Sequence, residues 1–474
     1  MTTFTDLGLP GELVRELNQR GVDKPFPIQA QAIPDALAGR DILGRGPTGS
    51  GKTFAFGLPM LTRLAGAPSK PGHPRGLVLA PTRELASQSA DRLSDLAATL
   101  GLRVIAVVGG VSIAKHLRAL VSPVDLLVAT PGRAKDLIDR KALSLSSVEV
   151  TAIDEADQMA DMGFLPQVRA LLDLTAAGGQ RMLFSATLDN QVDKLVRNYL
   201  RDPVTHSTAP VTAAVDTMDH YRFLCRTPQN RNQVAIAIAA RDGRTIMFNR
   251  TRRGVDRTVK RLRKAGINAA GLHGDKAQGS REKALAGFAA GSVPVLVATD
   301  IAARGIDVAD VSLVVHLDPP AEHKAYLHRA GRTARAGHAG TVVTLTTSEQ
   351  EDEVATLLRK AGVTATDVEV TPDSEQLKQI TGAGEPSGTP LPPFGSPEAD
   401  AMGLGAPSKG GRAVGGAPVH PRGKKSTRGT RGGQRGQRGR RRAKGAVKGA
   451  VKGSVKGPVQ GAVKRAAKNS PRQR

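Results

Sequence analysis

Residues 46–53 read GPTGSGKT and directly follow a short apolar run. A glycine, four residues and then Gly-Lys-Thr is the pattern of a phosphate-binding loop between a strand and a helix. Its glycines let backbone N–H groups curl round phosphates, and the following helix points its positive end at them. We expect Lys52 to hold the β- and γ-phosphates and Thr53 to ligate Mg²⁺. The residues expected at the phosphates are Thr48, Gly49, Ser50, Gly51, Lys52 and Thr53.

A second, acidic element must accompany such a loop, because Mg²⁺ needs a carboxylate and the attacking water must be oriented. Asp-Glu-Ala-Asp, residues 154–157, follows the apolar run 148–153 and so lies at the carboxyl edge of a sheet, where open α/β sheets bind ligands. We expect Asp154 to bind the metal and Glu155 to polarise the water. An acidic tetrad alone is more often a helix cap, but its pairing with a phosphate loop favours catalysis.

Short apolar, β-branched runs recur from residue 76 to residue 346 and alternate with stretches of helical spacing. Strands that are apolar on both faces and alternate with helices indicate parallel sheets covered on both sides. The runs form two series, which predicts two α/β domains. The first series is 76–80, 103–108, 125–129, 148–153 and 181–184, and the second is 245–248, 293–298, 313–317 and 341–345.

Polar and Pro/Gly-rich stretches predict where the domains end. Residues 202–216 have weak periodicity and read as a linker. Residues 382–400 are rich in Pro and Gly and are not expected to pack. The predicted organisation is a first domain at 1–203, a linker at 204–218, a second domain at 219–372, a Pro/Gly-rich linker at 373–400 and a disordered tail at 401–474.

The tail carries most of the excess positive charge. The chain has 474 residues with 68 Lys and Arg against 43 Asp and Glu, and 21 of the basic residues but none of the acidic ones lie beyond residue 400. A segment of this composition predicts a polyanion partner, nucleic acid first, bound by phosphate neutralisation, since Phe394 is the last aromatic residue. A solubilising tail without a dedicated RNA role is the alternative.

Several classes of protein are excluded or disfavoured by the same composition. The single Cys225 rules out a disulfide framework within the chain and a zinc site built on cysteines, and we expect it to be a buried apolar residue. The N-terminus has no basic start before an apolar core, and 18 apolar residues never run together. We therefore expect a soluble, cytoplasmic protein that does not contact a membrane.

With these motifs in order, the sequence resembles the DEAD-box family of superfamily 2 helicases over about residues 4–350. Asp-Glu-Ala-Asp is the signature of that family, and short motifs flank it at suitable spacing: GVDKPFPIQ (21–29), PTREL (81–85), TPGR (130–133), SAT (185–187), QGSR (278–281), ATDIAARGID (298–307) and HRAGRTAR (328–335). The resemblance implies two tandem RecA-like parallel-sheet domains. It also implies an enzyme that hydrolyses ATP with Mg²⁺. Ala334 stands where the family usually has Gly, and Gly46 where Ala is common.

The resemblance also implies roles for individual residues. Phe4 and Gln29 would bind ATP, with the Gln29 amide reading the adenine edge, and Asp307 would bind the nucleotide from the second domain. Arg332 and Arg335 would act as arginine fingers on the γ-phosphate. RNA would be bound by Arg83, Gly110, Thr130, Gly132, Arg133, Arg281, Thr299 and Asp300. The ATP site would be coupled to strand separation by Asp157, Ser185, Thr187 and His328.

Because the phosphate loop and the arginine fingers lie in different domains, the ATPase site is complete only when the domains close. ATP and single-stranded RNA would both favour the closed state, and each would then strengthen binding of the other. We expect RNA-stimulated ATP hydrolysis that unwinds short duplexes or remodels RNA–protein complexes, with ribosomal or RNA-turnover proteins as possible partners. A superfamily 2 DNA translocase and an RNA annealer or clamp are the competing interpretations.

Overall fold

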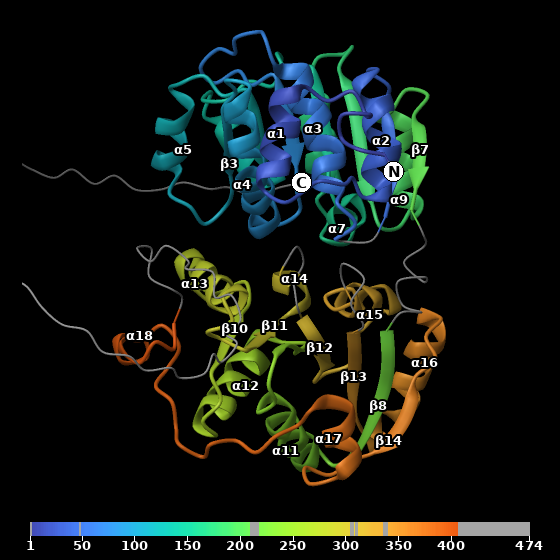
Figure 1. The fold of residues 1–474 in the computed structure, drawn as a ribbon, viewed down its shortest axis with the longest axis vertical. Helices are drawn as coiled ribbons and strands as arrows, with labels where there is room; N and C mark the ends of the chain where they lie inside the picture. Colours follow the sequence, from blue (N-terminus) through green and yellow to red (C-terminus); the bar gives the residue numbers. More distant parts are fainter. Residues whose placement is uncertain are drawn as a thin grey trace, which may run out of the picture. The chain divides into compact units, whose positions relative to one another are not determined.

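Two parallel sheets of seven strands each form the framework of the computed structural model (Figure 1). The structure describes residues 2–46, 49–208, 218–303, 308, 311–334 and 340–405, all of which belong to one compact unit, residues 1–411. We call the part built on the first sheet the first lobe and the part built on the second sheet the second lobe. None of the helices in the described ranges is both long and apolar enough to cross a membrane.

The first sheet has the strand order β3-β4-β2-β5-β6-β1-β7, and its strand pairs are parallel. Strands β2, β4 and β5 are buried along their whole length, as expected for apolar runs covered on both faces. The strands are β1 (Ile42–Arg45), β2 (Gly76–Leu79), β3 (Val104–Val107), β4 (Leu126–Ala129), β5 (Val150–Ile153), β6 (Gln180–Ser185) and β7 (Val204–Ser207).

Helices cover both faces of this sheet. Apolar residues of α1 to α4 share one core with the sheet, and apolar residues of α5 to α9 share the other. The Thr82 side chain caps α4 by accepting the N–H of Leu85, and Asp189 caps α9 by accepting the N–H groups of Gln191 and Val192. The helices are α1 (Gly11–Gln19), α2 (Pro27–Leu37), α3 (Lys52–Leu64), α4 (Arg83–Thr99), α5 (Ile113–Leu120), α6 (Pro131–Asp139), α7 (Ala156–Asp161), α8 (Leu165–Leu172) and α9 (Asn190–Tyr199).

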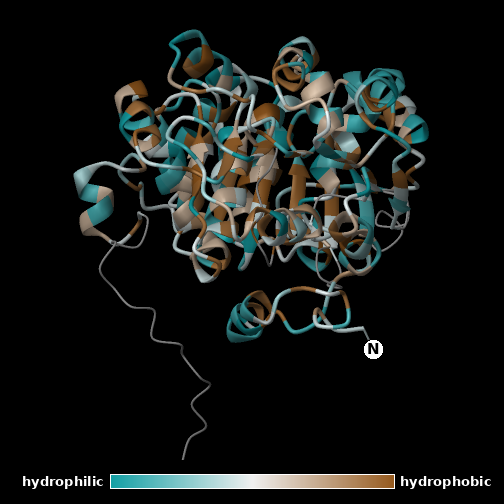
Figure 2. Ribbon diagram, turned by 90° about the horizontal axis from the view of Figure 1, so that it is seen from above, coloured by the Kyte–Doolittle hydropathy of each residue, from teal (hydrophilic) through white to brown (hydrophobic). Residues whose placement is uncertain are grey.

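The second sheet has the order β10-β11-β9-β12-β13-β8-β14, again with parallel pairs. Its strands are β8 (Met218–Arg226), β9 (Arg244–Phe248), β10 (Ala269–Leu272), β11 (Val295–Ala298), β12 (Val311–His316), β13 (Gly340–Thr347) and β14 (Thr366–Glu369). Figure 2 shows hydrophobic residues concentrated in the strands and hydrophilic residues on outward helix faces.

The second sheet is also covered on both faces. One core contains apolar residues of α13 to α16, and the other contains those of α11, α12 and α17. The helices are α11 (Pro228–Ala239), α12 (Arg252–Lys264), α13 (Gln278–Ala289), α14 (Asp300–Ala303), α15 (His323–Ala330), η1 (Ser348–Gln350), α16 (Glu351–Ala361), α17 (Glu375–Thr381) and α18 (Pro397–Ala401). The prediction of two parallel-sheet α/β domains is confirmed.

The structure corrects two expectations about the linkers. Strand β7 lies inside the expected linker at 204–218, yet it pairs with β1 along its whole length. The Pro/Gly-rich stretch at 382–400 is not expected to pack, but Ala383 is buried in the core of the second lobe and Ala399 is fully buried. Most of the linker, residues 209–217, and most of the expected tail, residues 406–474, lie outside the described residues.

Candidate active site

The phosphate loop connects β1 to α3, and its shape depends on two glycines with positive φ. Gly49 has a φ of +91° and Gly51 a φ of +90°, a region that L side chains rarely adopt. A Cβ on Gly51 would lie 2.4 Å from Nε2 of Gln29. The Gln29 side chain therefore packs directly against the loop backbone at Gly51. Thr48, expected at the phosphates, lies outside the described residues.

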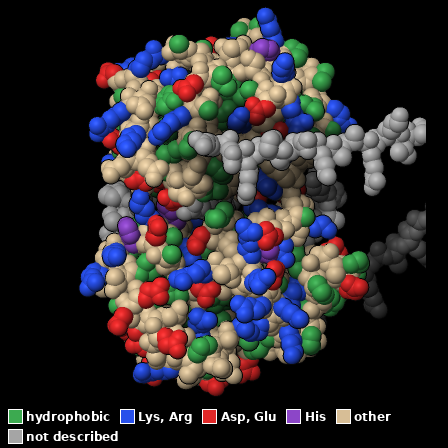
Figure 3. Space-filling view, turned by 180° about the vertical axis from the view of Figure 1, so that it is seen from behind, with side chains coloured by type: hydrophobic (Ala, Val, Ile, Leu, Met, Phe, Trp, Pro, Cys, Tyr) green, Lys and Arg blue, Asp and Glu red, His purple; other side chains and the backbone are tan. Residues whose placement is uncertain are grey.

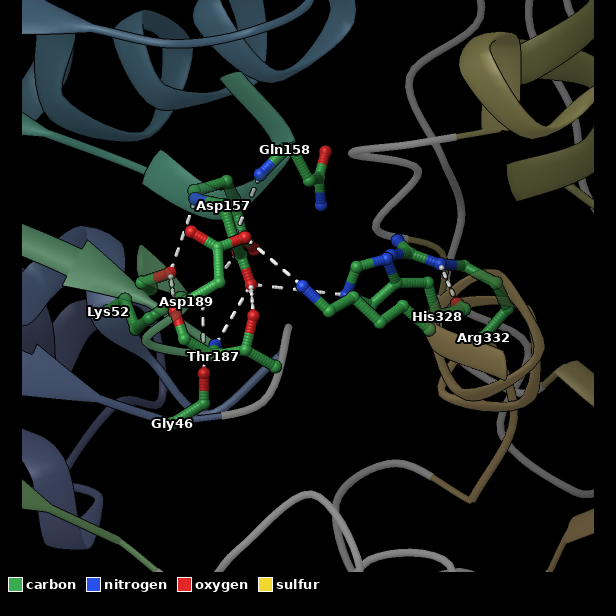
Figure 4. Close-up of polar contacts among 11 residues, drawn as sticks. Gly46, Lys52, Asp157, Gln158, Thr187, Asp189, His328 and Arg332 are labelled. Carbon is green, nitrogen blue, oxygen red and sulfur yellow. Dashed lines mark hydrogen bonds and ion pairs between the residues drawn. The ribbon is translucent and has the colours of Figure 1, made fainter. Parts of the chain in front are cut away.

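Lys52 and Glu155 form a buried ion pair at the start of α3. Nζ of Lys52 donates to Oε2 of Glu155 at 2.9 Å and to the carbonyl oxygen of Gly46 at 3.1 Å (Figure 4). Burial opposes the charge on Lys52, but the carboxylates of Glu155, Asp154 and Asp157 outweigh it and raise the lysine pKa. Glu155 has a φ of +51°, a strained conformation of the kind that gathers at functional sites. The lysine expected at the phosphates thus lies beside the expected catalytic acid.

Asp154 offers a ligand position for a cation. Its side chain is 2% exposed, and its Oδ1 has no hydrogen-bond partner among the described residues. Burial, together with the charge of Glu155, raises the pKa of Asp154 to about 7. No group of three His, Cys, Asp or Glu in the described ranges could hold a metal by itself. A Mg²⁺ ion would fit one carboxylate and the Thr53 hydroxyl, because this ion takes other ligands from phosphates and water.

Asp157, the last acid of the tetrad, connects it to residues 185–187. Oδ2 of Asp157 accepts the backbone N–H of Thr187 at 2.9 Å and its hydroxyl at 3.0 Å. The Ser185 hydroxyl accepts the N–H of Asp157 at 3.2 Å and donates to the carbonyl oxygen of Thr187 at 2.7 Å. Nε2 of His328, from α15 of the second lobe, lies 4.0 Å from Oδ2 of Asp157 (Figure 4). The four residues expected to couple the two activities therefore lie together.

The second lobe contributes Arg332 beside His328. Arg332 is buried, and its Nε donates to the carbonyl oxygen of His328 at 3.2 Å. Arg335 and Asp307, expected at the γ-phosphate and the nucleotide, lie outside the described residues. Arg329 has no role predicted from the sequence, yet it binds both oxygens of Asp300, with Nη2 at 2.8 Å from Oδ2. Asp300, expected at RNA, is therefore an acceptor for Arg329 within its own lobe.

A cavity of 350 Å³ opens beside the Lys52–Glu155 pair. Gln29 lines it, but its Nε2 donates to the carbonyl oxygen of Gly51 at 2.9 Å and its Oε1 accepts the N–H of Phe26 at 2.8 Å. Phe4, expected to bind ATP, is buried in the core and does not line this cavity. Helix α4 supplies a wall of this cavity with Leu85, Gln88, Ser89 and Arg92, and of these only Leu85 belongs to a motif, PTREL, which predicts RNA contact and not nucleotide binding.

A second cavity, of 480 Å³, gathers most of the residues expected to bind RNA. It is lined by Arg83, Thr130, Gly132, Arg133 and Arg281, among others. Gly110 lies directly under the Arg83 guanidinium, since a Cβ there would be 2.0 Å from Nη1 of that arginine. Thr299 and Asp300 do not line this cavity.

Two further ion pairs join the lobes. Nη2 of Arg281 lies 2.7 Å from Oε2 of Glu84, and both side chains are buried. Nζ of Lys324 on α15 donates to Oδ2 of Asp189 at 3.1 Å. Glu84 and Arg281 both line the second cavity, and Asp189 lies two residues after Thr187 of the motif at 185–187. The ion pairs between the lobes therefore lie at the second cavity and beside the residues expected to couple the two activities.

A phosphate loop with a facing acidic tetrad, completed by a second parallel-sheet lobe, defines a nucleotide-dependent helicase of two lobes. A family model described as DEAD/DEAH box helicase matches residues 26–195, and one described as helicase conserved C-terminal domain matches residues 229–337. The DEAD-box ATP-dependent RNA helicase CshA of Bacillus cereus is 37% identical over 363 residues, which cover 76% of this chain and 68% of that protein. The chain belongs to the DEAD-box ATP-dependent RNA helicases.

Other relatives agree in family and fold. DEAD-box ATP-dependent RNA helicase 3B, chloroplastic, of Zea mays is 42% identical over 365 residues, or 75% of this chain. The chain spans 49% of the length of that maize protein. The structure of S. cerevisiae Dbp5 bound to RNA and ADP BeF3 aligns with a TM-score of 0.72 at 26% identity, covering 80% of this chain and 100% of the chain in that structure.

Proposed function

We propose that this protein hydrolyses ATP to separate short RNA duplexes, or to remodel RNA–protein complexes, by closing its two lobes on a single strand. The observation that carries the proposal is a series of contacts across the acidic tetrad. Glu155 pairs with Lys52 of the phosphate loop, and Asp157 binds Thr187 and lies 4.0 Å from His328 of the other lobe. The Dbp5 structure, bound to RNA and ADP BeF3, supports it by analogy.

The chemistry assigned to the first lobe follows from its contacts. A bound phosphate would pair with the Lys52 ammonium in place of Glu155. The Glu155 carboxylate would then be free to accept a proton from the attacking water. Thr53 and Asp154 would hold Mg²⁺, which neutralises charge on the phosphates. Arg332, with Arg335, would stabilise charge on the γ-phosphate from the second lobe, a contribution of about 10³ to 10⁵ in rate in related chemistry.

RNA would bind in the 480 Å³ cavity. Arg83, Arg133 and Arg281 line it, and arginines of this kind bind phosphates without reading the bases. Because residues of both lobes line the cavity, a strand bound there favours closure, and ATP and RNA should strengthen the binding of each other. The basic segment beyond residue 405 would add affinity by counterion release, and that predicts a steep dependence on salt.

ATPase assays of the full chain with RNA, with DNA and with neither test this function. We expect RNA stimulation in the wild type and near-complete loss of activity in Glu155→Gln, because an amide cannot accept the proton. Glu149→Gln is a matched control, since Glu149 pairs with Arg75 away from the site. Equal stimulation by DNA would favour a DNA translocase, and full activity in Glu155→Gln would refute the assigned chemistry. Strand annealing that survives Lys52→Ala would favour an RNA clamp.

A further inference from the structure

Helix α12 carries a row of basic side chains along its exposed face. Exposed basic side chains are numerous on the second lobe (Figure 3), and on α12 they recur at intervals of one helical turn. Residues three or four apart lie on the same side of an α-helix, so these side chains share one face. The opposite face is buried, with Val255 and Leu262 in the core. We call the members of this row the basic stripe: Arg253, Arg257, Lys260, Arg261 and Lys264.

The charges of the basic stripe are not balanced by neighbouring acids. Arg252, the first residue of α12, pairs with Asp275, and Asp256, the acid of this helix, pairs with Lys276. Among the described residues, no carboxylate forms an ion pair with a member of the stripe. The stripe is therefore a row of positive charge that the described part of the protein leaves without a counter-charge.

Arg261 shows the effect of this crowding. Its Nη1 donates to Oδ1 of Asn232 at 2.6 Å, and this acceptor is neutral. Burial, followed by the positive charges of Arg257 and Arg231, lowers the pKa of the Arg261 guanidinium. Like charges held close together repel one another, and an anion placed beside them would relieve that repulsion.

A small cavity of 20 Å³ borders the stripe between α11 and α12. Arg231, Thr258 and Arg261 line it, together with Asn249, which is 6% exposed. Oδ1 of Asn249 has no hydrogen-bond partner among the described residues. A cavity of this size has room for about one water molecule or hydroxyl group and not for a base. The edge of the stripe therefore offers an acceptor to a hydroxyl donor, a group that every ribose of RNA carries.

The stripe begins at the edge of the 480 Å³ cavity. Gly274 lines that cavity, and a Cβ on Gly274 would lie 3.9 Å from Nε of Arg252. Arg253, the first member of the stripe, is the next residue of the chain. From Arg253 to Lys264 the helix is about 17 Å long. The stripe thus leads from the cavity along the second lobe, over a distance that several phosphates of one strand can follow.

We propose that the basic stripe binds the phosphate backbone of single-stranded RNA where the strand leaves the cavity. This inference rests on the proposed RNA function, and none of the stripe residues belongs to a helicase motif found in the sequence. Cations in a row neutralise phosphates without reading bases, and the acceptor at Asn249 suits a ribose better than an acidic protein segment. The stripe should contribute affinity that falls with salt, without affecting the chemistry at Glu155.

The test uses the full chain, single-stranded RNAs of about 6 and about 20 nucleotides, and a non-hydrolysable ATP analogue. The stripe variant is Arg257→Gln with Lys260→Gln and Lys264→Gln. With the longer RNA, its slope of log affinity against log salt should be less steep by about 2, because each lost phosphate contact contributes about 0.7. Its deficit relative to the wild type should shrink roughly 20-fold between about 50 and 200 mM salt. The slope with the shorter RNA and the kcat of ATP hydrolysis at saturating RNA should not change.

Arg359→Gln with Lys360→Gln and Lys378→Gln is the matched control. It removes the same charge from exposed positions of the second lobe, on α16 and α17, and should follow the wild type with both RNAs. A deficit of equal size in the control would mean that net charge alone acts, which overturns the proposed contact. An equal change of slope with both RNAs would mean that the stripe contacts the strand inside the cavity, which overturns binding of the flank.

Lysine acetylation followed by mass spectrometry tests the contact in the wild type, without any substitution. The longer RNA should protect Lys260 and Lys264 but not Lys360 and Lys378, and the shorter RNA should protect none of these four lysines. Equal labelling of Lys260 and Lys264 with and without the longer RNA would overturn the proposal and leave the stripe to solvent or to a protein partner. Absence of RNA stimulation of the wild-type ATPase would instead refute the proposed function itself.

Discussion

His116 on α5 shows how one neutral side chain supports a candidate RNA-binding residue. Its Nδ1 lies 2.6 Å from Nη1 of Arg133, so the ring must accept the arginine N–H. Burial, together with the positive charges of Arg133 and Lys115, lowers the pKa of His116 from 6.5 to about 4. The folded protein therefore favours the neutral form of the His116 imidazole.

This contact makes stability depend on pH. His116 takes up a proton near pH 6.5 in the unfolded chain but only near pH 4 in the folded chain. Its contribution to the free energy of unfolding is therefore complete above pH 6.5 and is lost as the pH falls towards 4. We expect urea unfolding to show a steeper loss of free energy between about pH 6.5 and 4.5 in the wild type than in His116→Gln, whose amide oxygen can still accept. His323→Gln, an exposed control, should follow the wild type. Parallel curves for wild type and His116→Gln would contradict this.

Gln158 directly follows the acidic tetrad and is fully buried (Figure 4). Neither Oε1 nor Nε2 has a hydrogen-bond partner among the described residues. An unsatisfied buried amide costs about 1–3 kcal/mol, so Gln158→Met should stabilise the first lobe and raise its Tm by roughly 2–4 °C per kcal/mol. Calorimetry would check this, with the exposed Gln191→Met as a control. A lower Tm would mean that the amide has a partner in solution.

Helix α4 contributes more to the site than its motif, PTREL, predicts. PTREL predicts its start and an RNA-contacting arginine, but the next two turns supply a wall of the nucleotide-side cavity. Ser89 is 1% exposed, and its hydroxyl has no partner among the described residues. Ser89 therefore places a buried polar group at the edge of this cavity.

Filling that wall should impair nucleotide binding. We expect Ser89→Leu to raise the KM for ATP at least about tenfold, because the larger, branched side chain must enter space that the ligand needs and overpacking costs about 1–3 kcal/mol. Ser89→Ala removes only the hydroxyl and should change the KM little. ATPase titrations of both variants at saturating RNA would decide. An unchanged KM in Ser89→Leu would show that nucleotide does not reach α4.

How far the elements can be predicted depends on their pattern. Buried runs such as 126–129 and 295–298 are recognisable because they are apolar without interruption. Strand β8 (Met218–Arg226) escapes prediction because His220 and Arg222 interrupt its apolar residues, and β14 because Thr366, Asp367 and Glu369 are exposed. The packing of residues 384–391 also escapes prediction, because backbone hydrogen bonds to Ala237, Ala265 and Arg263 hold this stretch, and Pro/Gly composition does not reveal such bonds.

The candidate site is predictable where a motif fixes the chemistry. The phosphate loop, the acidic tetrad and residues 185–187 are expected together and lie together. Gln29 and Asp300 are expected at ligands, but their polar atoms are bonded to Gly51 and Arg329, partners that no motif reveals. Spacing along the chain cannot show which of several acceptors a side chain selects.

For the whole molecule, the pair between Lys324 and Asp189 tests whether lobe contact matters for activity. The two side chains are 30% and 24% exposed, so the pair should contribute only about 0.2–1 kcal/mol. Lys324→Gln and Asp189→Asn each remove it, and Asn keeps the cap on α9.

We expect each single change to weaken ATP-dependent RNA binding by about 1.4- to 5-fold and the double variant to be no weaker than the singles. RNA-binding titrations with ATP, at low and high salt, measure this coupling. The wild-type advantage should shrink at high salt because ions screen the pair. Additive losses in the double variant would show that the two residues act independently.

Strand β7 has a mechanical consequence for the nucleotide site. Among the described strands it is the edge strand of the first sheet and pairs with β1, whose end leads into the phosphate loop. Just beyond it, Thr208 N–H donates to Arg45 O at 3.0 Å, and a Cβ on Gly46 would lie 2.8 Å from Oγ1 of Thr208. The last described residue before the second lobe therefore contacts the start of the phosphate loop, so we expect a displacement of Thr208 to shift the backbone of Gly46 at the nucleotide site.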